Sequence, residues 1–212
     1  MMFRYESEMI PVLVKNLTRI FNTKYITTEF NTGNGVADLV FSTKLSEESL
    51  FFKDYGTMSL FVNLFKKNKK VRTDLLNNGQ YDKIKLKKLL KQLEFEDYIY
   101  FEGLEIKTTR NYKPHTNNLI SIEAKLKDWK SGFYQALRYK FFSEKSYLAF
   151  PKCGIHRVDI ELLKNHNIGL IAVDNEKIDF ILKPKSEKPQ DKISYFFLSE
   201  MFAQKFKLNA CA

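Results

Sequence analysis

The chain contains few of the residues that build disulfide frameworks or zinc sites. It has two cysteines, Cys153 and Cys211, and three histidines among its 212 residues. Neither set shows the close ligand spacing of a structural zinc site, and small disulfide-stapled proteins carry many more cysteines. The sequence therefore argues against both classes and favours a reducing compartment such as the cytoplasm.

Long apolar runs and targeting patterns are also absent from the sequence. No stretch approaches the roughly 20 apolar residues of a membrane-spanning helix, and the first ten residues lack the charged and then apolar pattern of a secretion signal. Glycine- or serine-rich linkers, internal repeats and low-complexity segments are missing as well. We therefore expect a soluble, cytoplasmic protein that is not associated with a membrane.

Positive charge is what the chain has in excess. The formal net charge is +10, while 44% hydrophobic and 15% aromatic residues are enough for a packed core. Residues 66–113 hold 13 Lys or Arg against 7 Asp or Glu, so more than half of the excess lies in less than a quarter of the chain. Net charge indicates partners rather than fold. Nucleic acid is the first candidate partner, and an anionic membrane surface is the second.

The basic region reads as a small unit of its own. Helical patterns at 58–65, 71–76 and 82–93 are followed by two short strands, at 98–101 and 104–108. Three short helices and then a hairpin are typical of a winged helix. Its third helix would present a stripe of lysines to DNA, with a solvated lysine face as the structural alternative; these residues are Lys83, Lys87, Lys88 and Lys91.

A buried strand is predicted at 119–125, where an apolar, β-branched run ends in Glu-Ala-Lys. Side chains alternate between the two faces of a strand, so Glu123 and Lys125 would leave it on the same side. Because a buried charge is costly unless it is paired or bound to metal, this strand end is either a solvated rim or a site. Glu-X-Lys alone is a common surface pair.

The remaining pattern predicts an α/β domain. Outside 50–116 the order is α-β-β-β-α-β-α-β-β-α, which implies a central mixed sheet with helices on both faces. The first helix, at 5–21, carries Glu6 and Glu8, and an apolar strand at 36–41 is centred on Asp38. The other expected elements are strands at 25–30, 146–150, 168–173 and 178–182, and helices at 129–142 (with Gln135 and Tyr139 on adjoining faces), 156–165 and 191–206.

This order of elements and polar residues resembles the PD-(D/E)XK nuclease superfamily, which has the restriction-endonuclease-like fold. The resemblance covers 1–49 and 117–183. Ala37, and not proline, precedes Asp38, as in many members that also lack this proline, and an inserted domain accounts for the long gap between Asp38 and the Glu-Ala-Lys strand. The matching residues are Glu6 (or Glu8), Asp38, Glu123, Ala124, Lys125 and Gln135.

The resemblance implies a metal-dependent deoxyribonuclease, an endonuclease that hydrolyses phosphodiester bonds. Asp38 and Glu123, with the backbone carbonyl of Ala124, would hold Mg²⁺ or Mn²⁺, since hard cations prefer oxygen ligands. Lys125 would orient or deprotonate the attacking water and offset phosphate charge. Glu6 would bind a second ion or a metal-bound water.

The sequence thus predicts a nuclease-like domain at 1–49 and 117–212 and an inserted winged-helix domain at 50–116 that binds double-stranded DNA. Gln135 would position the water or a phosphate. A homodimer is the assembly with which many such nucleases cut both strands. Two alternatives stay open: a DNA-binding regulator that keeps the nuclease fold without cleavage, and a subunit of a defence or repair complex whose winged helix contacts protein.

Overall fold

The computed structural model of the chain describes residues 3–46, 52, 54–66, 70–72, 82–109, 113–116 and 118–207. The chain forms two compact units. The larger unit combines Met1–Glu48 with His115–Ala212, and the insert unit is Ser49–Pro114. No helix among the described residues is both long and apolar enough to cross a membrane.

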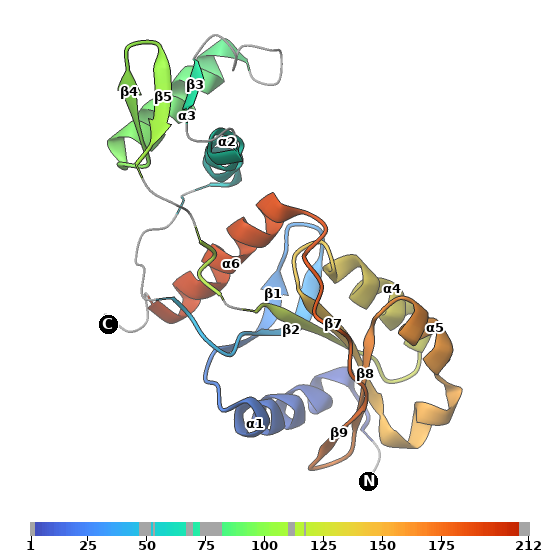
Figure 1. The fold of residues 1–212 in the computed structure, drawn as a ribbon. Coiled ribbons are helices and arrows are strands. Elements are labelled where there is room, and N and C mark those ends of the chain that lie inside the picture. Colours follow the sequence, from blue (N-terminus) through green and yellow to red (C-terminus); the bar gives the residue numbers. More distant parts are fainter. Residues whose placement is uncertain are drawn as a thin grey trace. The chain divides into compact units, whose positions relative to one another are not determined.

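The larger unit is built on a six-stranded mixed sheet with the order β1-β2-β6-β7-β8-β9 (Figure 1). The three central strands β6, β7 and β8 run parallel, and the outer neighbours pair antiparallel. The α/β class and the mixed sheet are therefore confirmed. The strands are β1 (Ile26–Asn31), β2 (Val36–Phe41), β6 (Ile120–Ala124), β7 (Lys145–Pro151), β8 (Gly169–Val173) and β9 (Ile178–Leu182).

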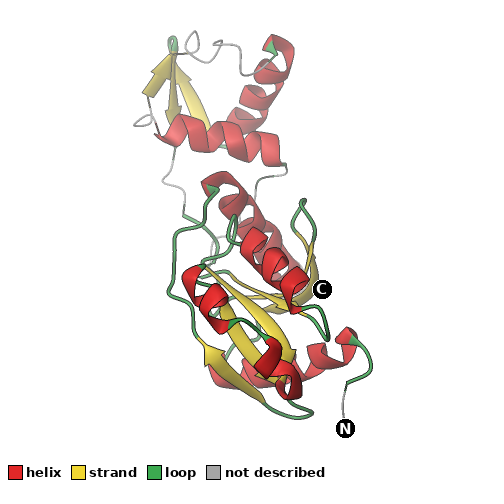
Figure 2. Cartoon of the chain, turned by 90° about the vertical axis from the view of Figure 1, so that its right-hand side faces the viewer, coloured by secondary structure: helices red, strands yellow, loops and turns green. Residues whose placement is uncertain are grey.

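Helices flank both faces of this sheet (Figure 2). On one face, α1 (Met9–Phe21) packs its buried leucines against β2, β6, β7 and β8. On the other face, α4 (Trp129–Tyr139) and α5 (Ile160–Asn165) cover β7 and β8. Strands covered on both faces read as continuous apolar runs, and all residues of β6 and β8 are buried. A closing helix, α6 (Lys192–Lys207), packs Phe202 against Phe30 of β1.

Several predicted boundaries shift for local reasons. The first helix begins with a short 3-10 turn, η1 (Glu6–Glu8), before α1. The helix predicted at 156–165 divides into a 3-10 segment, η3 (Lys152–Arg157), and α5, because Val158 is extended and the Asp159 carboxylate caps α5 by accepting from Leu162 N at 2.9 Å.

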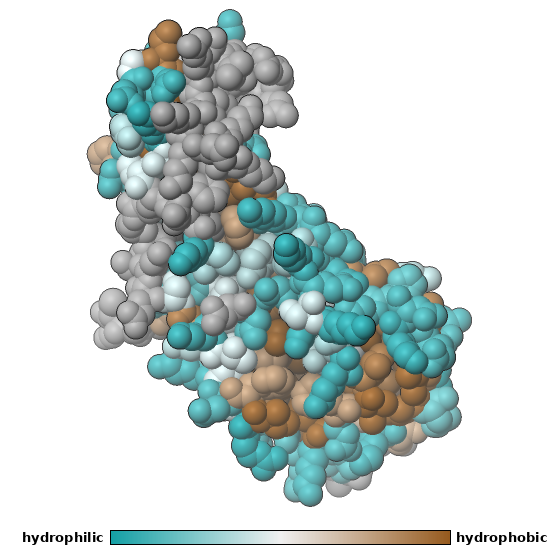
Figure 3. All heavy atoms as spheres, in the orientation of Figure 1, coloured by the Kyte–Doolittle hydropathy of each residue, from teal (hydrophilic) through white to brown (hydrophobic). Residues whose placement is uncertain are grey.

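Hydrophilic side chains cover much of the face of the larger unit seen in Figure 3.

The described residues of the insert unit form two helices and a three-stranded sheet in the order β3-β5-β4. The helix predicted at 71–76 is wrong in its first two residues. They belong to a strand, in which Val71 pairs with Ile106, and 73–76 lie outside the described residues. The elements are α2 (Tyr55–Lys66), β3 (Lys70–Arg72), α3 (Lys83–Phe95), β4 (Ile99–Glu102) and β5 (Glu105–Thr108).

The insert unit leaves the larger unit after β2 and returns before β6, and these two strands are neighbours in the sheet. Beyond the ends of the strands, Leu45 and Thr116 still form a β-bridge, and Ser46 N donates to the His115 carbonyl oxygen at 2.8 Å. The chain ends that flank the insert are therefore held side by side within the larger unit.

Candidate functional site

Asp38 and Glu123 meet across the β2–β6 pair. Leu39 is paired with Ile122 and Val40 with Ser121. One further step of this register sets Asp38 opposite Glu123, and opposite residues of an antiparallel pair project to the same face. Asp38 Oδ2 also accepts a hydrogen bond from Ala124 N at 2.7 Å, across 86 positions of sequence. The two carboxylates are therefore close in space.

Lys125 joins these carboxylates at the end of β6. Its Nζ lies 2.8 Å from Glu123 Oε1 and 3.5 Å from Glu6 Oε2, and its side chain is 17% exposed. Glu6 reaches the site from η1, where its Oε1 accepts from Leu126 N at 3.1 Å. We call Glu6, Asp38, Glu123 and Lys125 the carboxylate–lysine cluster.

Glycine at position 132 allows α4 to approach the cluster closely. A Cβ atom on Gly132 would lie 2.7 Å from Lys125 Cγ and 2.6 Å from Leu148 Cδ1, which is closer than packed carbon atoms allow. The stem of Lys125 therefore packs directly against the backbone of α4 at Gly132, a contact that a side chain at this position would prevent.

Tyr139 of α4, which the sequence pattern placed on this helix without a role, is a further partner of Glu123. Its buried hydroxyl lies 2.8 Å from Glu123 Oε2 and 2.8 Å from the Val36 carbonyl oxygen. Lys125 and Tyr139 thus hold the two oxygens of the Glu123 carboxylate. The sequence did contain a signal for this contact: Tyr139 lies one turn after Gln135 on a helix that faces the sheet. A buried tyrosine hydroxyl usually finds a hydrogen-bond partner.

The electrostatics of the cluster follow from its burial. Burial raises the pKa of Asp38, against the Ala124 hydrogen bond and the Lys125 charge. It also raises the pKa of Glu123, and the Asp38 charge adds to this rise. Burial works to lower the pKa of Lys125, but the hydrogen bond to Glu123 and the surrounding carboxylates outweigh it, so that pKa is raised. With three carboxylates facing one ammonium, the ionised cluster favours an added cation.

We expect the metal-free protein to lose stability as pH rises above the ordinary carboxyl range. The folded state holds protons on Asp38 and Glu123 more tightly than the unfolded chain, whose carboxyls titrate near 3.8 and 4.5. The unfolded state therefore binds fewer protons just above these values, and the free energy of unfolding falls as pH rises through that window. Thermal unfolding in EDTA should show a steeper fall for the parent than for the Asp38→Asn/Glu123→Gln variant. Parallel curves would contradict this assignment.

The other predicted site residues lie apart from these contacts. Gln135 is half-buried, and its described hydrogen bond is to Ser131 Oγ of the same helix, at 3.5 Å. Glu8 Oε2 accepts from Arg4 N at 2.7 Å, so this carboxylate caps its own turn, and Glu6 is the one that reaches the cluster. All four predicted lysines on α3 are exposed on the insert unit, namely Lys83, Lys87, Lys88 and Lys91.

The cluster suits a hard cation that is only partly held by protein. Among the residues that the structure describes, no three His, Cys, Asp or Glu side chains form a metal-binding group. Mg²⁺ usually takes one or two carboxylates and completes its shell with water and substrate phosphate. Asp38, Glu123 and the Ala124 carbonyl are oxygen donors of that kind, so the donor set fits the ion.

Comparison with known proteins supplies no family assignment. No protein-family model matches the chain, and no curated protein matches it. A solved structure, the SPO1766 protein of unknown function from Silicibacter pomeroyi, is 14% identical with a TM-score of 0.31. The match covers 44% of this chain and 62% of that one, so it spans less than two thirds of that protein. A likeness of this extent carries no argument about function.

Proposed function

We propose that the protein is a metal-dependent DNA endonuclease of the PD-(D/E)XK type, with a restriction-endonuclease-like fold in its larger unit. The observation that carries the proposal is the meeting of Asp38, Glu123 and Lys125 at one end of the β2–β6 pair. These residues come from segments separated by a whole inserted unit. A structural ion pair needs Glu123 and Lys125, but it does not need the half-buried Asp38 carboxylate beside them.

Each residue of the cluster has a separate role in phosphodiester hydrolysis. Asp38, Glu123 and the Ala124 carbonyl would hold Mg²⁺ or Mn²⁺, which supplies Lewis acidity and a bound water when present. The raised pKa of Lys125 keeps its ammonium charged, so the side chain orients water and neutralises phosphate charge in preference to acting as a base. Glu6 holds Lys125 from the other side. Tyr139 fixes the orientation of the Glu123 carboxylate.

A winged-helix fold is proposed for the insert unit. A helix, a strand, a second helix and a hairpin follow one another, and β3 pairs with the last strand in the order β3-β5-β4. On α3, four leucines are buried and the lysines lie on the exposed side. Exposed lysines on the helix before a wing suit contacts with the phosphates or the major groove of duplex DNA.

Replacing Lys83, Lys87, Lys88 and Lys91 with alanine should weaken DNA binding. For every phosphate that a lysine no longer neutralises, the slope of log affinity against log salt concentration should also fall by about one. Fluorescence anisotropy over a salt series measures both quantities. Four exposed lysines of the larger unit, Lys15, Lys24, Lys164 and Lys188, form the matched control, because their removal changes the net charge equally. If both variants lose the same DNA affinity, the α3 lysines act only through the net charge of the protein and do not contact DNA specifically.

Incubation with linear, circular and single-stranded DNA in Mg²⁺, Mn²⁺ or EDTA tests the proposed activity. Cleavage that requires the ion and is lost in Asp38→Ala supports the endonuclease. Tight DNA binding without cleavage under every condition favours a non-cleaving regulator. Absence of both favours a subunit of a larger complex, in which the insert unit contacts protein.

A further inference from the structure

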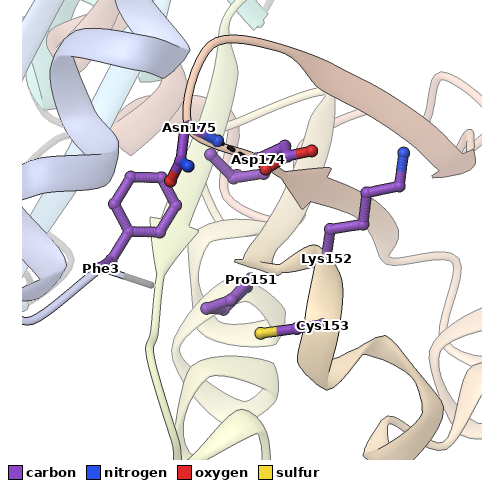
Figure 4. A pocket seen from close by; sticks show the side chains of 7 residues that line it. Phe3, Pro151, Lys152, Cys153, Asp174 and Asn175 are labelled. Atoms are coloured by element: carbon purple, nitrogen blue, oxygen red, sulfur yellow. Dashed lines mark hydrogen bonds between the residues drawn. The ribbon is translucent and has the colours of Figure 1, made fainter. Parts of the chain in front are cut away.

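A pocket of about 270 Å³ lies at the carboxyl ends of β7 and β8 (Figure 4). Pro151 and Val173, the last residues of these strands, form its apolar part. Ligands of α/β sheets commonly bind beyond the carboxyl ends of parallel strands. The remaining lining residues are Phe3, Lys152, Cys153, Asp174 and Asn175.

The pocket lies along the same end of the sheet as the carboxylate–lysine cluster. The end of β6 adjoins β7, since Lys125 N donates to the Ala149 carbonyl oxygen at 3.0 Å. One short segment serves both places, because Glu6 joins the cluster and Phe3, three residues earlier, lines the pocket. Neighbouring strands are about 4.8 Å apart, so the ends of β6 and β8 are about 10 Å apart. Because the two places also lie toward opposite faces of the sheet, about one to two nucleotides are needed to reach from one to the other.

The two places lie toward opposite faces of the sheet. Val173 packs with the α1 core, whereas Glu123 points to Tyr139 of α4. Glu6 lies at the edge between them, where it accepts from Leu126 N. A nucleic-acid strand that crosses this edge can leave a phosphate at the cluster and place an adjacent base in the pocket.

The lining has the chemistry of a site for a flat ring with polar edges. Phe3 and the buried Pro151 supply apolar surfaces against which a ring can stack. The Asn175 side chain lies next to the Phe3 ring (Figure 4); the described hydrogen bond of this residue is made by its backbone N, which donates to Asp174 Oδ1 at 2.8 Å, and its side-chain carboxamide has none among the described residues. A carboxamide offers both a donor and an acceptor, as base edges require. At the rim, the exposed Lys152 ammonium pairs with Asp179 at 2.8 Å and can also meet a phosphate.

We propose that this pocket binds one unpaired nucleobase of the nucleic-acid substrate, next to the phosphate held at the cluster. The inference rests on the proposed nuclease function and adds a substrate class to it. A stacked, paired base cannot enter a pocket of this kind, so the substrate would carry a single-stranded segment, a loop or a frayed end at the cleavage position. Aromatic stacking of bases tolerates any sequence, so this class is defined by structure and not by sequence.

Cys153 reports directly on occupancy of the pocket because it lines the pocket and is exposed. Changing Cys211 to serine leaves Cys153 as the one thiol of the chain. The rate of its alkylation by N-ethylmaleimide is measured in EDTA, where no cleavage occurs. Three ligands are compared at concentrations at which anisotropy shows them bound: oligothymidylate, an abasic oligonucleotide of the same length, and a blunt duplex.

Oligothymidylate should slow alkylation strongly, and the abasic strand and the duplex should leave it nearly unchanged. Phe3→Ala and Asn175→Ala should each weaken the protection, the former by about tenfold in the concentration required, since base stacking on one aromatic ring is typically that strong. Tyr134→Ala is the matched control, because Tyr134 is an aromatic residue of α4 that is 66% exposed and lies outside the pocket lining. In the Tyr134→Ala variant, oligothymidylate should protect the Cys153 thiol from alkylation as strongly as in the parent.

Equal protection by the abasic strand would overturn the proposal, because the backbone alone would then cover the pocket. Absence of protection by bound oligothymidylate would overturn it as well. The assay needs no metal and no turnover, so protection without any Mg²⁺-dependent cleavage would leave the pocket assignment standing while the nuclease proposal fails. Cleavage without protection would give the reverse result.

Discussion

Lys125→Ala is expected to reduce DNA cleavage by at least about 100-fold while DNA binding stays close to that of the parent, because loss of one group that stabilises transition-state charge typically costs this much. The ammonium lies 2.8 Å from Glu123 and points along the polar side of a strand end. Its contribution is made as charge develops on the phosphate, so turnover should fall and affinity should not.

Single-turnover cleavage and anisotropy measured on the same preparation separate these two effects. Without metal, the variant should also be less stable, since three carboxylates then lose the cation between them, and Mg²⁺ should restore part of that stability. Lys127→Ala is the matched control, two residues further along and exposed. If the Lys125→Ala variant cuts DNA at the parental rate, Glu123 and Lys125 form only a structural ion pair and have no role in cleavage.

Asp38→Ala should also abolish cleavage, but through loss of the metal. Titration calorimetry should show weaker binding of Mg²⁺ or Mn²⁺ to this variant, whereas Lys125→Ala should bind the ion at least as well as the parent, because a competing positive charge has gone. In EDTA, Asp38→Ala should bind DNA slightly more tightly, since a carboxylate repels phosphate.

Glu161→Ala provides the control for the removal of one carboxylate, because Glu161 is an exposed residue of α5 outside the cluster. Parental metal affinity in Asp38→Ala would leave Asp38 with a structural role only, as acceptor for the Ala124 amide. The Lys125→Ala and Asp38→Ala variants are therefore both expected to lose cleavage, but only Asp38→Ala is expected to lose affinity for the metal ion.

The sheet could be predicted from sequence because its signals are local. The run at 36–41 coincides with β2, and the apolar strand at 119–125 contains β6. The alternation of side chains along a strand also predicted correctly that Glu123 and Lys125 project to the same side of β6, where they form an ion pair. The approach of Asp38 to this strand followed from one topological assumption, that the insert leaves and returns at neighbouring strands.

The parts that sequence did not predict depend on geometry that no short pattern contains. The choice between Glu6 and Glu8 turns on a 3-10 turn before α1, which directs one carboxylate to Lys125 and the other to its own backbone. The contact of Tyr139 depends on how α4 is rotated against the sheet. Strand β3 is three residues long, and so short a segment shows no period of its own, so its pairing with β5 decides its structure.

The joint between the two units has a consequence for how such a protein can change. Antiparallel neighbours such as β2 and β6 need no more than a tight hairpin to connect them, and the Leu45–Thr116 bridge continues their pairing to the point of departure. The cost of closing a loop rises only slowly with its length, so almost any folded module can occupy this hairpin tip without disturbing the sheet. In the proposed nuclease, the unit that contacts DNA could therefore be replaced while the carboxylate–lysine cluster keeps its geometry.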